Sequence, residues 1–149
     1  MEIEPIFQLA KTFRNAIVSV PKNEFKTSLG CTNFPHACCD DASLLLAAFL
    51  SDNGHVGSYR VHGIHGGSKE ELRTHVWLSY SGLIIDITAD QFLSYEQPPI
   101  IVALESNFHK TFEIESKEAA DFRVKFANDS NWLSKFGRDY EKLLNKINA

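Results

Sequence analysis

The chain has 149 residues, of which 44% are hydrophobic, and its formal net charge is −4. This length suits a single domain, spanning residues 1–149, with a substantial core. The acidic balance argues against a nucleic-acid-binding surface. The longest uninterrupted apolar run, residues 44–50, is far shorter than the roughly 20 residues that a membrane-spanning helix needs, so we expect no membrane contact.

Cysteine usage indicates the compartment. The chain has three cysteines, two of them adjacent, which makes a poor disulfide framework. The opening residues Met-Glu-Ile-Glu-Pro are acidic and lack the apolar segment of a secretory signal. We therefore expect a reducing, cytoplasmic location.

The first half of the chain predicts two helices. Apolar residues recur at helical spacing over residues 4–18, and Pro21 ends that pattern. Residues 22–37 contain Thr, Asn, Gly and Pro and indicate a long loop. A second helix then carries Cys39 in its first turn, runs to Leu50 with apolar residues on most of its circumference, and stops before Gly54.

The second half predicts strands followed by a helix. Strands are expected over residues 57–63, 74–80, 83–88 and 100–104, with 110–114 as a further candidate. Residues 65–71 read as a polar turn. Ser130 is the expected N-cap of a last helix that reaches Ile147. Helices, then antiparallel strands, then a helix give an α+β domain.

Ser81-Gly82 is a hairpin signal between two of these strands. A two-residue turn pairs positions that sum to 163, which places His75 near Thr88 and Trp77 near Asp86. His75 and Asp86 then meet on one side of the ribbon only through a bulge or a diagonal contact. Either way they lie within a few residues of each other on neighbouring strands.

Cys39 at a helix start, His75 on a strand and Asp86 on the next strand follow the layout of cysteine hydrolases. His75 would take the thiol proton, Asp86 would hold the other imidazole nitrogen, and Cys39 would attack an acyl carbon. The alternatives are inert packing for the cysteine, a core histidine, and a carboxylate that satisfies a hairpin. Cys31 and Cys38 are expected to be packing residues, and Trp77 to pack beside the imidazole.

Four short motifs follow in order: residues 39–45 (Cys-Asp-Asp-Ala-Ser-Leu-Leu), 59–63 (Tyr-Arg-Val-His-Gly), 75–77 (His-Val-Trp) and 86–88 (Asp-Ile-Thr). Over residues 33–92 the chain resembles the transglutaminase-like branch of the papain-like cysteine enzymes, and residues 86–92 resemble a bacterial subgroup of it. The resemblance implies a papain-like α+β core with Cys39 as nucleophile, His75 as base and Asp86 as orienting acid. Ile87 stands where the family has proline, which alters the backbone there.

The remaining site residues are less defined. The Cys39 backbone N–H is one oxyanion donor by geometry. Asn33 is a candidate second donor, because it lies where papain-like proteases place a glutamine, and Gln91 is a weaker candidate. Asp40 and Asp41 disfavour a thiolate through their charge, although they suit a helix N-terminus.

A zinc site is an alternative reading of the cysteines together with His62 and His65. Their spacing does not match the usual zinc motifs, so we expect no metal and no cofactor.

Two classes of function remain. The first is a cysteine-dependent amide hydrolase or acyl transferase, such as a peptidase or deamidase, acting on a protein or peptide through a thioester. The second is a binding module that keeps this fold without turnover. The intact set of Cys39, His75 and Asp86 favours the enzyme. The sequence leaves the substrate and the oligomeric state open.

Overall fold

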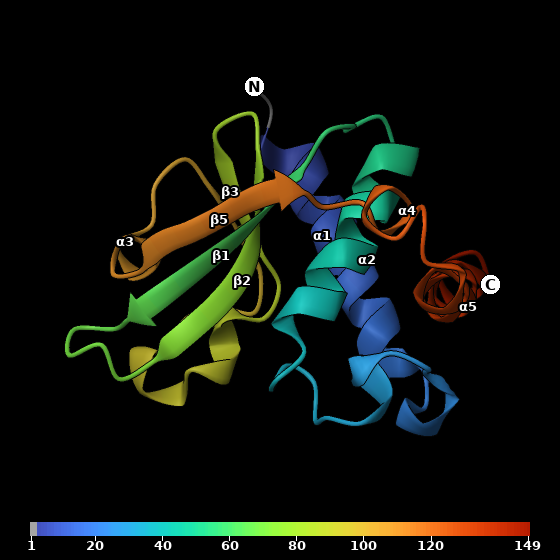
Figure 1. Cartoon of the computed structure of the whole chain (residues 1–149), viewed down its shortest axis with the longest axis horizontal. Coiled ribbons are helices and arrows are strands. Elements are labelled where there is room, and N and C mark those ends of the chain that lie inside the picture. Colours follow the sequence, from blue (N-terminus) through green and yellow to red (C-terminus); the bar gives the residue numbers. More distant parts are fainter. Residues whose placement is uncertain (1–2) are drawn as a thin grey trace.

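A computed structural model describes residues 3–149 as an antiparallel sheet beside a group of helices (Figure 1). The five strands are β1 (Tyr59–Gly66), β2 (Arg73–Tyr80), β3 (Leu83–Asp86), β4 (Ile101–Ala103) and β5 (Glu113–Ala119), in the order β4-β3-β2-β1-β5. The α-helices are α1 (Ile3–Ser19), α2 (Cys39–Asp52), α3 (Asn107–Lys110), α4 (Phe122–Lys125) and α5 (Ser130–Ile147). Short 3-10 helices are η1 (Lys22–Glu24), η2 (Ser28–Gly30), η3 (Ala89–Gln91) and η4 (Leu93–Tyr95). The expected α+β class is confirmed.

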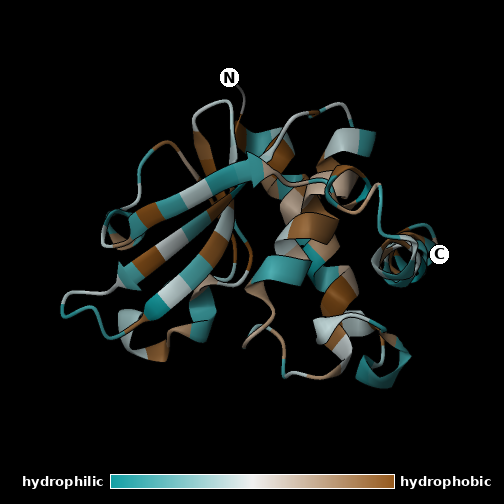
Figure 2. Ribbon diagram, viewed as in Figure 1, coloured by the Kyte–Doolittle hydropathy of each residue, from teal (hydrophilic) through white to brown (hydrophobic). Residues whose placement is uncertain are grey.

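Helix α2 lies at the centre of the main core, packed against β2 and β1 on one side and against α1 on the other. Every residue from Ala42 to Leu50 is buried, which explains its apolar sequence, and hydrophobic residues gather along it in Figure 2. Helix α5 packs on α1 and α4. The N-terminal end of α2 is thereby held against the sheet by contacts around the whole helix.

The two faces of the sheet bury different sets of side chains, because neighbouring residues of a strand point to opposite faces. Leu78, Leu83 and Ile85 join the main core with α1 and α2. Val61 and Trp77 belong to a second, smaller cluster with Ile101, Phe108 and Phe112. His75 is two residues before Trp77, so its side chain points to the face of this second cluster.

The hairpin register is as predicted. Leu78 pairs with Ile85, Ser79 with Ile84 and Tyr80 with Leu83, and each pair sums to 163. Continued by one pair, this register places Asp86 opposite Trp77, on the same face as His75. The contact between His75 and Asp86 is therefore the diagonal one and needs no bulge.

Several element boundaries differ from those predicted. Strand β1 continues through His65 to Gly66, so the turn expected at residue 65 begins later. Residues 110–114 are not one strand, because α3 ends at Lys110 and β5 starts at Glu113. The last helix is capped by Asp129, whose side chain accepts a hydrogen bond from the Trp132 backbone N–H. Aspartate is as good an N-cap as serine, and it stands one residue earlier.

Candidate functional site

Cys39 is the first residue of α2 and is partly exposed. Its neighbour Cys38 occupies the N-cap and is buried in the main core. Burial raises the pKa of the Cys38 thiol from 9.0 to about 11. Cys31 is exposed in the preceding loop. Cys39 thus combines partial access with the free backbone N–H groups of a helix N-terminus, which favour negative charge.

The two acidic residues after Cys39 are both engaged by neighbours. Arg60 of β1 donates to both oxygens of Asp40, at 2.7 and 2.9 Å. Asp41 accepts from the backbone N–H of Ser28 at 2.9 Å. Asp40 therefore carries its own counter-cation, which offsets part of the negative charge expected beside the thiol.

Arg60 also brings positive charge toward the thiol. Its hydrogen bonds with Asp40 raise the pKa of Arg60 above its ordinary value, against the effect of burial, and the charge of Cys39 acts in the same direction. The Arg60 side chain is 12% exposed and that of Asp40 is 44% exposed, so solvent screens this ion pair in part. The arginine of the 59–63 motif consequently joins β1 to the start of the cysteine helix.

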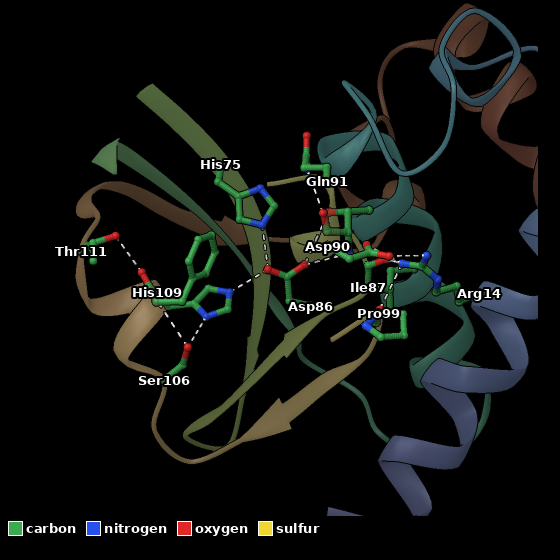
Figure 3. A network of polar contacts seen from close by, with 12 residues as sticks. Arg14, His75, Asp86, Ile87, Asp90, Gln91, Pro99, Ser106, His109 and Thr111 are labelled. Carbon is green, nitrogen blue, oxygen red and sulfur yellow. Dashed lines mark hydrogen bonds and ion pairs between the residues drawn. The ribbon is translucent and has the colours of Figure 1, made fainter. Parts of the chain in front are cut away.

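His75 and Asp86 form a buried, charge-assisted pair (Figure 3). The His75 Nε2 group donates to Asp86 Oδ2 at 2.7 Å, and their side chains are 0% and 1% exposed. Asp86 Oδ1 accepts from the Thr88 backbone N–H at 2.9 Å, so the Asp-x-Thr motif ties the carboxylate to its own loop. Burial opposes the charge of this carboxylate, yet His75 and the hydrogen bonds hold the pKa of Asp86 below its usual range.

The pKa of His75 responds to both of the other predicted triad residues. Burial disfavours the imidazolium, but the Asp86 carboxylate outweighs it and the Cys39 side chain adds to the effect, so the pKa of His75 rises from 6.5 to about 10. Nε2 is used by Asp86. Nδ1 is buried and has no hydrogen-bond partner among residues 3–149, Cys39 included, so contact between the thiol and Nδ1 stays a prediction.

Aromatic rings enclose the imidazole of His75. The Phe92 ring meets it edge-on at 5.0 Å between ring centroids, and the rings of Trp77 and Phe112 lie at 5.7 and 5.9 Å. Gly63 makes this packing possible, since a Cβ there would lie 2.7 Å from the Phe112 Cβ and 2.8 Å from the Trp77 ring. The glycine of the 59–63 motif is thus required by the close approach of these rings.

His109 of α3 is a part of the site that the sequence did not reveal. Its Nε2 lies 2.6 Å from Asp86 Oδ2, and its Nδ1 lies 2.6 Å from the Ser106 hydroxyl (Figure 3). The residue falls outside the 33–92 span of the resemblance, and no motif marks it. The local signal in the sequence is Ser106, a favourable N-cap residue for the short helix that carries His109.

The side chains of His75, Asp86 and His109 offer ligand atoms within 4.8 Å of one another, a set that metal ions use. Zinc holds nitrogen and oxygen ligands about 2.0–2.2 Å from the ion, which keeps tetrahedral ligand atoms more than about 3 Å apart. Here both histidine nitrogens lie 2.6–2.7 Å from a single carboxylate oxygen. That spacing is the spacing of hydrogen bonds and does not fit a shared metal ion.

His62 and His65, the other histidines of the zinc reading, lie 3.2 Å from Glu115 and Glu113 on β5. These side-chain pairs join β1 to β5.

The two amides considered for the oxyanion hole occupy different places. The Asn33 side-chain oxygen accepts from the Lys22 ammonium at 3.1 Å. Gln91 bridges the two loops of the site, since its amide donates to the Thr88 carbonyl at 3.0 Å and accepts from the Ala37 N–H at 3.5 Å. Gln91 is therefore the amide tied to both the cysteine loop and the aspartate loop, and the role of Asn33 stays a prediction.

Arg14 of α1 anchors the loop that follows Asp86. It binds both oxygens of Asp90, at 2.8 and 2.7 Å, and also donates to the carbonyl oxygens of Ile87 and Pro99 (Figure 3). Its guanidinium lies 5.0 Å from the centre of the Phe34 ring, in the loop before Cys39. One buried cation thus holds both loops against the first helix.

The main surface hollows do not contain Cys39 or His75. The largest described, about 410 Å³, is lined by residues of α1 and of the loop before the cysteines, including Lys22 and Asn33. Another, about 230 Å³, lies between α1 and residues 98–100. Neither of these two hollows is lined by Cys39 or His75.

Comparisons of the chain with protein-family models, with curated proteins and with solved structures found no match. Within residues 3–149, none of the helices has the length and apolar character needed to cross a membrane.

Proposed function

We propose that this protein is a cysteine-dependent amide hydrolase with a transglutaminase-like arrangement of Cys39, His75 and Asp86. The observation that carries the proposal is the buried pair of His75 and Asp86, whose free imidazole nitrogen is left for a partly exposed thiol at a helix N-terminus. A histidine with one nitrogen held by a carboxylate and the other beside a nucleophile is the arrangement of acyl-transfer enzymes. The order of the motifs and the α+β architecture support the papain-like reading of the fold.

The chemistry follows from where the proton resides. The pKa of His75 is raised to about 10, so its imidazolium is the proton donor at neutral pH, and the attacking form of Cys39 is the thiolate. The thiolate attacks the amide carbonyl, forming a carbon–sulfur bond and a tetrahedral oxyanion that the Cys39 backbone N–H can stabilise. As the carbon–nitrogen bond breaks, the imidazolium gives its proton to the departing amine. Water then attacks the thioester, yielding a carboxylic acid and the free thiolate, and His75 regains the proton.

The substrate class is a protein or peptide with an accessible amide bond. Cys39 is partly exposed, so an extended chain or a protruding side chain can reach it. Hydrolysis is favoured over transfer to an amine, since no feature of the described residues builds an amine site beside the thiol that would outcompete water.

The proposal is tested by product mass. The protein is incubated with a peptide library and with glutamine-containing proteins, with and without a primary amine. Backbone cleavage identifies a peptidase, a gain of about 1 Da per site identifies deamidation, and a gain equal to the amine identifies transfer.

All products should vanish in Cys39→Ala and persist in the matched control Cys31→Ser, whose thiol is exposed outside the site. Full activity of Cys39→Ala refutes the mechanism. Absence of every product, together with no covalent adduct on Cys39 from an electrophilic peptide, favours the binding module.

A further inference from the structure

His109 shares the carboxylate of Asp86 with His75 but is no part of the predicted triad. The two imidazoles approach the same oxygen, Oδ2, at 2.7 and 2.6 Å, and come from β2 and from α3. His109 is 4% exposed, so its buried ring needs hydrogen-bond partners at both nitrogens. It has them in Asp86 and in Ser106.

The hydrogen bonds define which nitrogen of His109 carries the proton. The Ser106 hydroxyl oxygen accepts from the His109 backbone N–H at 3.2 Å, and its own proton is in reach of His109 Nδ1 at 2.6 Å. With Nδ1 as the acceptor of that proton, Nε2 carries the N–H that points at Asp86. His109 therefore acts as a hydrogen-bond donor to the carboxylate.

The carboxylate of Asp86 is consequently fixed at both oxygens. Thr88 holds Oδ1 through its backbone N–H, while His75 and His109 converge on Oδ2. Rotation of the carboxylate would break hydrogen bonds at both ends. Without His109, Oδ2 would be held by His75 alone.

We propose that His109, oriented by Ser106, is a positioning residue that holds Asp86 so that Asp86 keeps His75 directed at Cys39. This inference rests on the proposed function and extends it by two residues outside the triad. The titratable groups that face His75 are Asp86 from β3, Cys39 from α2 and His109 from α3. Loss of His109 should therefore weaken the pairing of His75 with the thiol.

The test compares His109→Leu with His109→Gln in a Cys31→Ser background, where Cys39 is the accessible thiol. Leucine fills the space without a donor, whereas the glutamine amide can present an N–H near the position of Nε2. The rate of alkylation by iodoacetamide is measured at pH 6 and at pH 9.

His109→Leu should lower the rate at pH 6 about tenfold, the factor of a hydrogen bond to a charged group at the lower end of its range. The same substitution should change the alkylation rate at pH 9 much less, because a cysteine is largely ionised at that pH even without an imidazolium partner. His109→Gln should stay within about threefold of the parent, since it keeps a donor. A folded His109→Leu whose rates fall equally at both pH values, or do not fall, overturns the positioning role.

A second readout separates this inference from the proposed function. Side-chain ¹⁵N NMR of the parent should show His109 protonated at Nε2, and His109→Leu should speed solvent exchange of the His75 Nε2 proton. A proton on Nδ1 of His109 instead, or unchanged exchange in His109→Leu, overturns the inference even if Cys39 is reactive. If alkylation of the parent already equals that of His75→Ala, the proposed function fails, and the NMR result alone decides whether His109 positions the pair.

Should His109→Leu not fold, Ser106→Ala and Ser106→Thr provide the equivalent pair. Only the threonine variant keeps the hydroxyl that orients His109, so only it should retain the parent rate at pH 6. Equal rates in the two variants overturn the role of Ser106.

Discussion

The raised pKa of His75 predicts a defined loss of stability on the alkaline side of neutrality. A group whose pKa is higher in the folded state stabilises the fold fully below its unfolded pKa, and that contribution is lost as the pH rises toward the folded pKa. For His75 these limits are 6.5 and about 10. Between these two pKa values the free energy of unfolding should fall by at most about 1.4 kcal/mol per pH unit. The slope is smaller near pH 6.5, so the total fall between pH 6.5 and 8.5 is about 2 kcal/mol.

The assay is urea unfolding followed by fluorescence at half-unit steps from pH 6.5 to 8.5. The upper limit is set by Cys38, whose pKa is about 11 in the folded protein. Its thiol therefore ionises at lower pH in the unfolded chain than in the fold, and this difference lowers stability above pH 9. Asp86→Asn removes the carboxylate while keeping its size, so its stability should be lower at pH 6.5 and nearly independent of pH across the window. Subtracting the stability curve of Asp86→Asn from that of the parent protein removes the contribution of histidines whose surroundings are the same in both.

His62→Gln is the matched control for removing a histidine. Its imidazole is 23% exposed and pairs with Glu115, which is itself 54% exposed, so it should keep the slope of the parent protein. A flat parent curve between pH 6.5 and 8.5 would refute the account of His75 as a buried imidazolium. An equal slope in Asp86→Asn would show that Asp86 does not hold that proton.

Three further changes probe the surroundings of the site. Gly63→Ala should destabilise the fold by about 1–3 kcal/mol in urea unfolding, since the new Cβ would meet the Phe112 Cβ at 2.7 Å. Arg60→Met should slow alkylation of the helix-terminal thiol at pH 6 several-fold by leaving Asp40 without its cation, and Arg60→Lys should slow it less. Mass mapping after brief alkylation of the native protein should find Cys38 unmodified until urea unfolds the chain, because burial keeps it protonated and covered.

The parts of the site that could be predicted from sequence depend on local rules. The Ser81-Gly82 turn set the hairpin register, and that register brought His75 to within a diagonal of Asp86. Helical periodicity from Ala42 onward placed Cys39 in the first turn of a helix, and α2 begins at that residue. These features follow from spacing along short stretches of chain, where few alternatives compete.

The parts that could not be predicted depend on where distant segments meet. His109 reaches Asp86 across 23 residues, from a four-residue helix, and lies between the two strands expected at residues 100–104 and 110–114. The cation for Asp40 comes from Arg60, 20 residues away. The contact of the Asn33 amide oxygen with Lys22 likewise joins side chains 11 residues apart and was not marked by any pattern. Side-chain pairing between distant loops is determined by tertiary packing, so no periodic pattern in the sequence indicates it.

The anchoring of the aspartate loop by Arg14 gives the thiol a further property. The salt bridge from Arg14 to Asp90 joins positions 76 residues apart, and closing so long a loop carries an entropic cost that local contacts do not have. If the proposed site is correct, a partly unfolded chain in which Arg14 has not met Asp90 holds Cys39 as an ordinary cysteine. Alkylation at pH 6 would then report how many molecules have docked the first helix against the aspartate loop.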